Sequence, residues 1–179
     1  FDVDGHVLAG WPVRTRGASL KLTAGPALGD LDGDGALEVV CGASDGSLWA
    51  WRAGGTLLTG FPVDFGSAVV GTVALSDLDG VTGVEIVACT RDGHVHAIRS
   101  DGSEIAGWPV AVSLPITSPV IGALGHLPAP TVFVAAGTRL DAFGADGALR
   151  FSAPLTSPVG GIANQDPALA DLDGDGADE

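Results

Sequence analysis

The sequence predicts an all-β fold built from repeated four-stranded units, and three observations support this prediction. An acidic loop recurs with starts at residues 30, 77, 126 and 171, so successive copies lie 47, 49 and 45 residues apart. Each copy carries short apolar runs separated by glycine-rich turns. The 28 glycines and 11 prolines among 179 residues leave few windows long enough for a helix. Such a period, with four strands per copy, is typical of a β-propeller blade.

The most distinctive copy of the loop is loop 1, residues 30–38, which reads D-L-D-G-D-G-A-L-E. So many like charges on one short loop repel each other unless a cation lies between them. Calcium, a hard cation that takes six to eight oxygen ligands, suits such a loop. We expect a further ligand from the backbone carbonyl of Ala36, because odd-numbered loop positions point inward. The predicted side-chain ligands are Asp30, Asp32, Asp34 and Glu38.

An EF-hand and a catalytic pair of carboxylates both fit loop 1 less well. An EF-hand also opens with D-x-D-x-D-G, but its bidentate glutamate occupies loop position 12, where this sequence has Cys41. Strand-like runs rather than helices flank the loop. Acid–base catalysis, as in a glycosidase, needs two carboxylates that face each other across a sugar, whereas these lie along one loop. A structural calcium site that repeats with the fold is therefore the better interpretation.

The other copies of the loop differ in their acids. Loop 2, residues 77–85, has Val81 at the third acidic position, so we expect it to bind calcium more weakly than loop 1. Its predicted ligands are Asp77, Asp79 and Glu85. The third copy begins at His126, lacks the acids and should bind none. The last copy has every expected group, but it ends at the final residue printed, and chain ends fray. Its predicted ligands are Asp171, Asp173, Asp175, Ala177 and Glu179.

Each copy also predicts its strands in order. In the first full copy they are expected at 26–29, 38–42, 47–51 and 60–63, and the second copy repeats the last three at 85–89, 94–98 and 107–110. The third copy gives 131–137, 138–143 and 146–155. Residues 1–13 match the end of a copy whose earlier part is missing. We therefore expect one propeller segment over residues 1–179, with three full blades between partial ones. The expected units are 1–23 (partial), 24–70, 71–119, 120–163 and 164–179 (partial).

The acidic loop and the strands around it resemble a known family. D-L-D-G-D-G-x-x-E, followed by E-V-V-x-G-x-x-D-G-x-L-W-A-W and G-W-P-V, is similar to the FG-GAP/VCBS repeats of integrin-like propellers. The resemblance covers nearly the whole chain. It implies calcium held within the blades without a catalytic role, in a secreted, periplasmic or cell-surface protein. It also implies a ring of around seven blades, so this segment should pair with another chain or with missing blades.

Charge and cysteine usage exclude some classes of protein. The net charge of −14 comes from 22 acidic and 8 basic residues, which argues against nucleic-acid binding. No apolar run is long enough to span a membrane as a helix, so we expect no membrane insertion. Cys41 and Cys89 stand in apolar strand runs and are expected to be buried, unpaired thiols. The redox compartment stays open.

His94 and His96 alternate on one predicted strand. Side chains two residues apart on a strand share a face, so the pair has the spacing of half a zinc site. No third ligand recurs nearby in the sequence. A surface or blade-packing role is therefore the preferred interpretation.

The aromatic residues divide into two groups. Trp11, Phe61 and Trp108 each precede a proline and recur with the repeat. Sugar-stacking platforms are often aromatic, but periodic aromatics are more often packing groups between blades. Trp49 and Trp51 are less regular, and we expect them to make exposed contacts.

These observations favour a non-enzymatic, calcium-binding propeller module that binds protein or carbohydrate outside the cytoplasm. No Ser–His–Asp set, G-x-S-x-G, P-loop or dinucleotide fingerprint is present in the sequence. Two alternatives remain open: the propeller part of a secreted polysaccharide-acting lyase or hydrolase, and a structural spacer in a surface protein.

Overall fold

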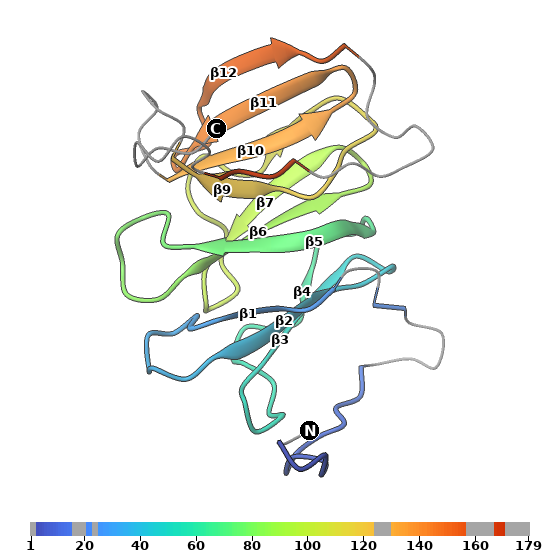
Figure 1. Cartoon of the computed structure of the whole chain (residues 1–179), viewed down its shortest axis with the longest axis vertical. Helices are drawn as coiled ribbons and strands as arrows, with labels where there is room; N and C mark the ends of the chain where they lie inside the picture. Colours follow the sequence, from blue (N-terminus) through green and yellow to red (C-terminus); the bar gives the residue numbers. More distant parts are fainter. Residues whose placement is uncertain (1–2, 16–20, 23–24, 124–129, 157–166, 171–179) are drawn as a thin grey trace.

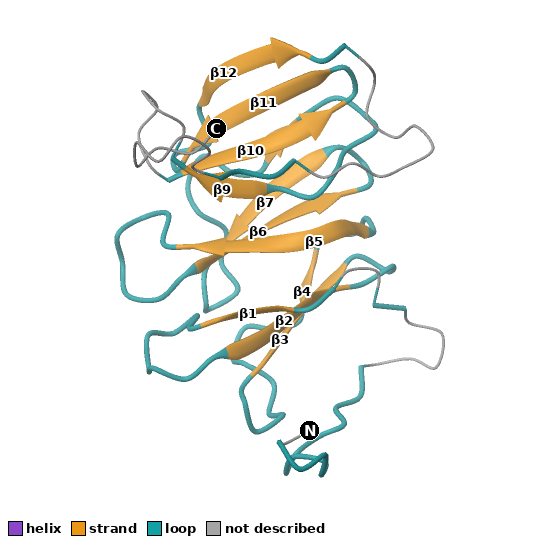
Figure 2. Cartoon of the chain, viewed as in Figure 1, coloured by secondary structure: helices purple, strands orange, loops and turns teal. Residues whose placement is uncertain are grey.

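Three antiparallel sheets of four strands each form the described part of the chain (Figures 1 and 2). The computed structural model describes residues 3–15, 21–22, 25–123, 130–156 and 167–170. No helix occurs among these residues, and glycine-rich turns join the strands. The prediction of an all-β, propeller-like segment with four-stranded blades is confirmed.

The strands of each sheet follow one another in chain order, so each sheet is one blade. Blade 1 contains β1 (Ala27–Gly29), β2 (Glu38–Gly42), β3 (Ser47–Trp51) and β4 (Val63–Asp64). Blade 2 contains β5 (Val69–Ser76), β6 (Glu85–Thr90), β7 (His94–Ile98) and β8 (Val110–Ala111). Blade 3 contains β9 (Val120–Gly122), β10 (Thr131–Ala136), β11 (Arg139–Gly144) and β12 (Leu149–Pro154).

Strand register shows which residues of the blades are equivalent. Val39 pairs with Trp51 in blade 1, and Ile86 pairs with Ile98 in blade 2. In blade 3 the corresponding pair is Val132 with Phe143. Position-by-position comparison of the blades is therefore possible, and the site below depends on it.

Apolar side chains fill the space between neighbouring blades. Successive residues of a strand point to opposite faces, so a blade between two others is apolar on both. In β6 every residue is buried. Ile86 packs in one cluster with Val40 of blade 1, and the next residue, Val87, packs in another with Val132 of blade 3. The blades therefore stack in order, with blade 2 in the middle (Figure 1).

The recurring aromatic before each proline packs on the blade that follows it. The Trp108 ring lies edge-on to Phe143, with ring centroids 6.1 Å apart, and its Nε1–H donates to the carbonyl of Ala145 at 2.9 Å. Trp11 likewise donates to the carbonyl of Ala53 at 2.7 Å, and Phe61 lies in the cluster between blades 1 and 2. The prediction that these residues pack between blades is confirmed.

The glycine before each of these aromatics permits this close approach. Gly60 has φ +93°, and a Cβ there would collide with the backbone carbonyl of Asp101 in blade 2. Gly107 has φ +96°, and a Cβ there would collide with the carbonyl of Asp146 in blade 3. Only glycine meets both demands, a left-handed backbone and direct backbone contact.

Trp49 and Trp51 are buried, which corrects the expectation of exposed contacts. Each is only 4% exposed. Their rings stack on each other at 5.7 Å, and Trp11 packs edge-on against Trp51 at 6.5 Å. The two residues point to the same face of β3, and together with Trp11 and Val13 they form a separate apolar cluster. Cys41 and Cys89 are both buried and unpaired, as predicted.

Candidate metal centre

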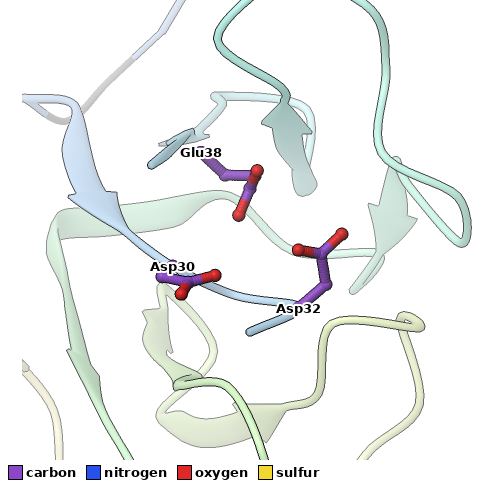
Figure 3. A group of neighbouring side chains, drawn as sticks. All are labelled: Asp30, Asp32 and Glu38. Carbon is purple, nitrogen blue, oxygen red and sulfur yellow. The ribbon is translucent and has the colours of Figure 1, made fainter. Parts of the chain in front are cut away.

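Loop 1 connects β1 to β2 and brings its two ends together. Gly29 is the register partner of Glu38, so Asp30 and Glu38 start and end the loop side by side. Asp30, Asp32 and Glu38 each offer an oxygen, and these oxygens lie within 4.8 Å of one another. Figure 3 shows the three carboxylates pointing toward a common space between them.

Glu38 is the most deeply placed of the three. Its side chain is 0% exposed, and its Oε2 accepts a hydrogen bond from the N–H of Leu31 at 2.9 Å. Burial raises the pKa of Glu38, and the nearby charges of Asp32 and Asp34 raise it further. Its Oε1 and the Oδ1 of Asp32 are buried without a hydrogen-bond partner. Buried carboxylate oxygens without a donor are costly, so these two atoms indicate a place for a positive charge.

Backbone amides fold loop 1 around its first aspartate. Asp30 accepts hydrogen bonds from the N–H groups of Asp34 and Gly35, both at 3.0 Å. Asp34 Oδ1 accepts from the N–H of Ala36 at 2.8 Å. Of the predicted side-chain ligands, Asp34 stands outside the converging group.

Loop 2 repeats this geometry in blade 2. Asp77, Asp79 and Glu85 also offer oxygens within 4.8 Å of one another. Glu85 is buried, which raises its pKa, and its Oε2 accepts from the N–H of Leu78 at 2.7 Å. Val81, at the position of Asp34, is exposed. Both loops thus contain a buried glutamate bonded to the N–H of the residue seven positions before it.

The two loops touch across the junction between the blades. The N–H of Val84 donates to the backbone carbonyl of Asp30 at 3.1 Å. Gly83 has φ +104°, and a Cβ there would collide with the carbonyl of Leu31. A cation in loop 1 would therefore brace blade 2 as well.

An arginine reaches into each loop, and neither arginine was predicted from the sequence as part of a site. Arg52 Nη2 lies 2.5 Å from Asp32 Oδ2, and its Nη1 lies 3.1 Å from Asp34 Oδ2 and 4.0 Å from Glu38 Oε1. The hydrogen bond to Asp32 raises the pKa of Arg52, so it stays charged.

In loop 2, the Nε and Nη2 of Arg99 both lie 2.9 Å from Asp79 Oδ2. Arg52 directly follows β3 and Arg99 directly follows β7, so the two are equivalent. This repeat position was the signal that could have identified them.

The remaining predicted loops lie outside the described residues. These are the copy that begins at His126 and the copy whose predicted ligands are Asp171, Asp173, Asp175, Ala177 and Glu179.

His94 and His96 have partners other than a shared metal. His96 Nδ1 lies 2.8 Å from Glu104 Oε1, and its ring stacks on Phe65 of blade 1 with centroids 4.1 Å apart. Burial lowers the pKa of His96, while the bond to Glu104 opposes that shift. His94 pairs with Asp92 at 3.2 Å. Within the described residues, the groups arranged to hold a metal are those of loops 1 and 2.

These oxygens fit a hard cation. Three carboxylates from one loop, two of them with buried, unpartnered oxygens, match the all-oxygen coordination of calcium. Nitrogen and sulfur ligands, which zinc prefers, are absent from both groups.

Comparison with known proteins supports the fold. No known protein family matches the sequence, and no curated protein does. Among solved structures, BamB from Moraxella catarrhalis is similar with a TM-score of 0.53 and 21% identity, over 74% of this chain and 36% of that one. The structure of BBS1N in complex with ARL6DN gives a TM-score of 0.53 and 17% identity, over 70% and 38%.

A protein of unknown function from Bacteroides caccae gives a TM-score of 0.50 and 12% identity, over 88% of this chain and 54% of that one. The chain thus spans between a third and little more than half of the length of these structures. At such identities the likeness concerns the fold alone, and that fold is propeller-like. Membership in the FG-GAP/VCBS family remains a resemblance in sequence.

Proposed function

We propose that this chain is a calcium-binding, non-enzymatic propeller module that binds a protein or glycan partner outside the cytoplasm. One observation carries the calcium assignment. Converging carboxylates in loop 1 include two buried oxygens, Asp32 Oδ1 and Glu38 Oε1, that no donor satisfies. A divalent cation would supply the missing positive charge and occupy those oxygens.

Calcium would act as a structural brace. Glu38 opens β2, and the carbonyl of Asp30 accepts the hydrogen bond from Val84 of blade 2. A cation between these residues joins two strands of one blade and holds their connection at the junction with the next. Because it binds the folded loop and not the unfolded chain, it stabilises the fold by mass action.

Two observations support a binding role without catalysis. The loop carboxylates accept bonds from backbone amides of their own loops rather than facing each other across a cleft. Among the similar structures, BBS1N is described in complex with ARL6DN, so at least one propeller-like neighbour takes a protein partner. The extension of that role to this chain is by analogy of fold.

The open face of blade 1 supports pairing with a further blade. Leu28 and Leu37 are exposed there, beside an apolar pocket that Trp11 also lines. Their equivalents in blade 2, Leu75 and Val84, pack against blade 1. The same packing on this face requires a blade from another chain or from further sequence.

Leu37→Lys should reduce self-association measured by sedimentation, because it places a charge on this open face. Leu149→Lys, at an exposed position on β12, is the control and should not. A chain that sediments as a monomer with both leucines present would contradict pairing between copies.

The calcium assignment is tested by melting the full chain after chelation and again with added calcium. At a hundred times the dissociation constant, calcium should contribute about 2.7 kcal/mol and raise the melting temperature. Asp32→Ala should remove most of that gain. Asp146→Ala, which alters an exposed ion pair with Arg150, should retain it. An unchanged melting curve, together with no calcium bound in equilibrium dialysis, would contradict the proposal.

A further inference from the structure

Arg52 lies where an incoming cation would have to bind. Its guanidinium contacts Asp32 and Asp34 and lies 4.0 Å from Glu38 Oε1, one of the two buried oxygens without a partner. The guanidinium therefore neutralises part of the charge that calcium would neutralise. Two positive groups cannot share so small a space without strong repulsion.

The arginine and the acidic loop occur together. Blades 1 and 2 have both, with Arg52 and Arg99 at equivalent positions. In blade 3 the register places Gly144 at that position, and the loop beginning at residue 126 has no acids. Only 8 of the 179 residues are basic, so the placement of two at these loops is specific.

The two arginines engage their loops to different degrees. Arg52 spans Asp32 and Asp34 and approaches Glu38, whereas Arg99 contacts a single oxygen, Asp79 Oδ2. The difference arises at Val81, because loop 2 lacks the outer aspartate that holds one arm of Arg52 in loop 1.

We propose that Arg52 and Arg99 are built-in competitors of calcium, which hold the metal-free loops folded and lower their affinity for the cation. This inference rests on the proposed calcium binding. When calcium enters loop 1, the guanidinium leaves Asp34 and Glu38 and the cation takes those oxygens. Competition is stronger in loop 1, because Arg52 makes more contacts there than Arg99 makes in loop 2. The loops thereby respond to calcium at higher concentrations than their carboxylates alone would set.

The test is calorimetric titration of the chelator-stripped chain with calcium chloride, for the unchanged chain and for Arg52→Gln. Removing a unit charge a few ångströms from the site should raise the affinity of one site by roughly tenfold or more. The same variant should melt at a lower temperature in chelator, because its carboxylates lose their counter-ion. Arg150→Gln, which removes an exposed ion pair with Asp146 far from both loops in sequence, is the matched control and should change neither.

The outcomes separate the two proposals. Calcium binding by the unchanged chain with equal or weaker affinity in Arg52→Gln would overturn the competition and leave the calcium site standing. No binding by any variant would overturn the calcium site and the competition with it. If Arg52→Gln does not fold, Arg99→Gln gives the same test at loop 2, where a smaller gain in affinity is expected.

Discussion

Blades 1 and 2 differ from blade 3 at two positions that act together. Glu38 and Glu85 are buried at the start of their strands, and Thr131 is buried at the equivalent position in blade 3. The arginine that follows β3 and β7 is replaced by Gly144. Blade 3 nevertheless forms the same four-stranded sheet and packs on blade 2 through the same register positions. The apolar pattern alone therefore specifies a blade, and the acidic loop is an addition to it.

The largest expected effect tests whether packing is common to all blades. Ile98 and Phe143 are equivalent, and both are buried at a junction between blades. Ile98→Ala should cost about 2–5 kcal/mol and Phe143→Ala about 3–5 kcal/mol of unfolding free energy, from lost burial and the cavity left behind. Urea unfolding in chelator measures both.

Leu149→Ala, an exposed position on β12, is the control and should change the unfolding free energy by no more than about 0.5 kcal/mol. If Phe143→Ala costs less than about 1 kcal/mol, blade 3 does not depend on the packing that the other blades use, and the comparison between them fails.

A smaller effect separates loop 1 from loop 2. Val81→Asp gives loop 2 the fourth carboxylate that Asp34 supplies in loop 1. Ligand charge sets much of calcium affinity, so loop 2 should bind roughly tenfold more tightly and approach loop 1. Val81→Asn, which adds an oxygen without charge, should give a smaller gain in the same titration. Equal affinity in all three chains would show that the outer position contributes nothing.

The sequence predicted the repeat well because each part of it has a local physical signature. Alternating acids, D-G turns and the apolar runs between them located loops 1 and 2 and the strands that flank them. The aromatic before each proline was also placed correctly, since a residue that recurs with the blade has the same surroundings each time.

The misses arose where a position depended on its neighbours in space. Trp49 and Trp51 were expected to be exposed, but the segment containing Trp11 packs on the same face of the blade. Arg52 resembles any solvated charge after a strand until the fold carries it to the loop.

Asp34 was expected to point inward with its alternating neighbours. Gly33 and Gly35, with φ of +74° and +87°, break the strand-like alternation on which that expectation rested.

The smallest expected effect concerns one position on the face toward the preceding blade. It is occupied by Trp49 in β3, His96 in β7 and Asp141 in β11. The position is apolar in blade 1, and in blade 3 the hydroxyl of Ser152 donates to Asp141. Only in blade 2 does it hold a group that titrates near neutral pH. His96 stacks there on Phe65 of blade 1 and is bonded to Glu104, with His94 and Asp92 nearby.

Because burial lowers the pKa of His96 below its ordinary value of 6.5, the folded state disfavours its charged form. Its contribution to stability is therefore fully present above pH 6.5 and is lost as the pH falls through the lower, folded-state pKa. His96→Gln should remove this loss, so the gap in melting temperature between the unchanged chain and the variant should narrow from pH 7.5 to pH 5. His94→Gln, at a half-exposed position on the same strand, should leave the loss in place. The aspartates whose pKa is lowered, such as Asp45 and Asp101, have ordinary values of 3.8 and change little in this range. A gap that stays constant with pH would show that the junction between blades 1 and 2 is as insensitive to acid as an apolar one.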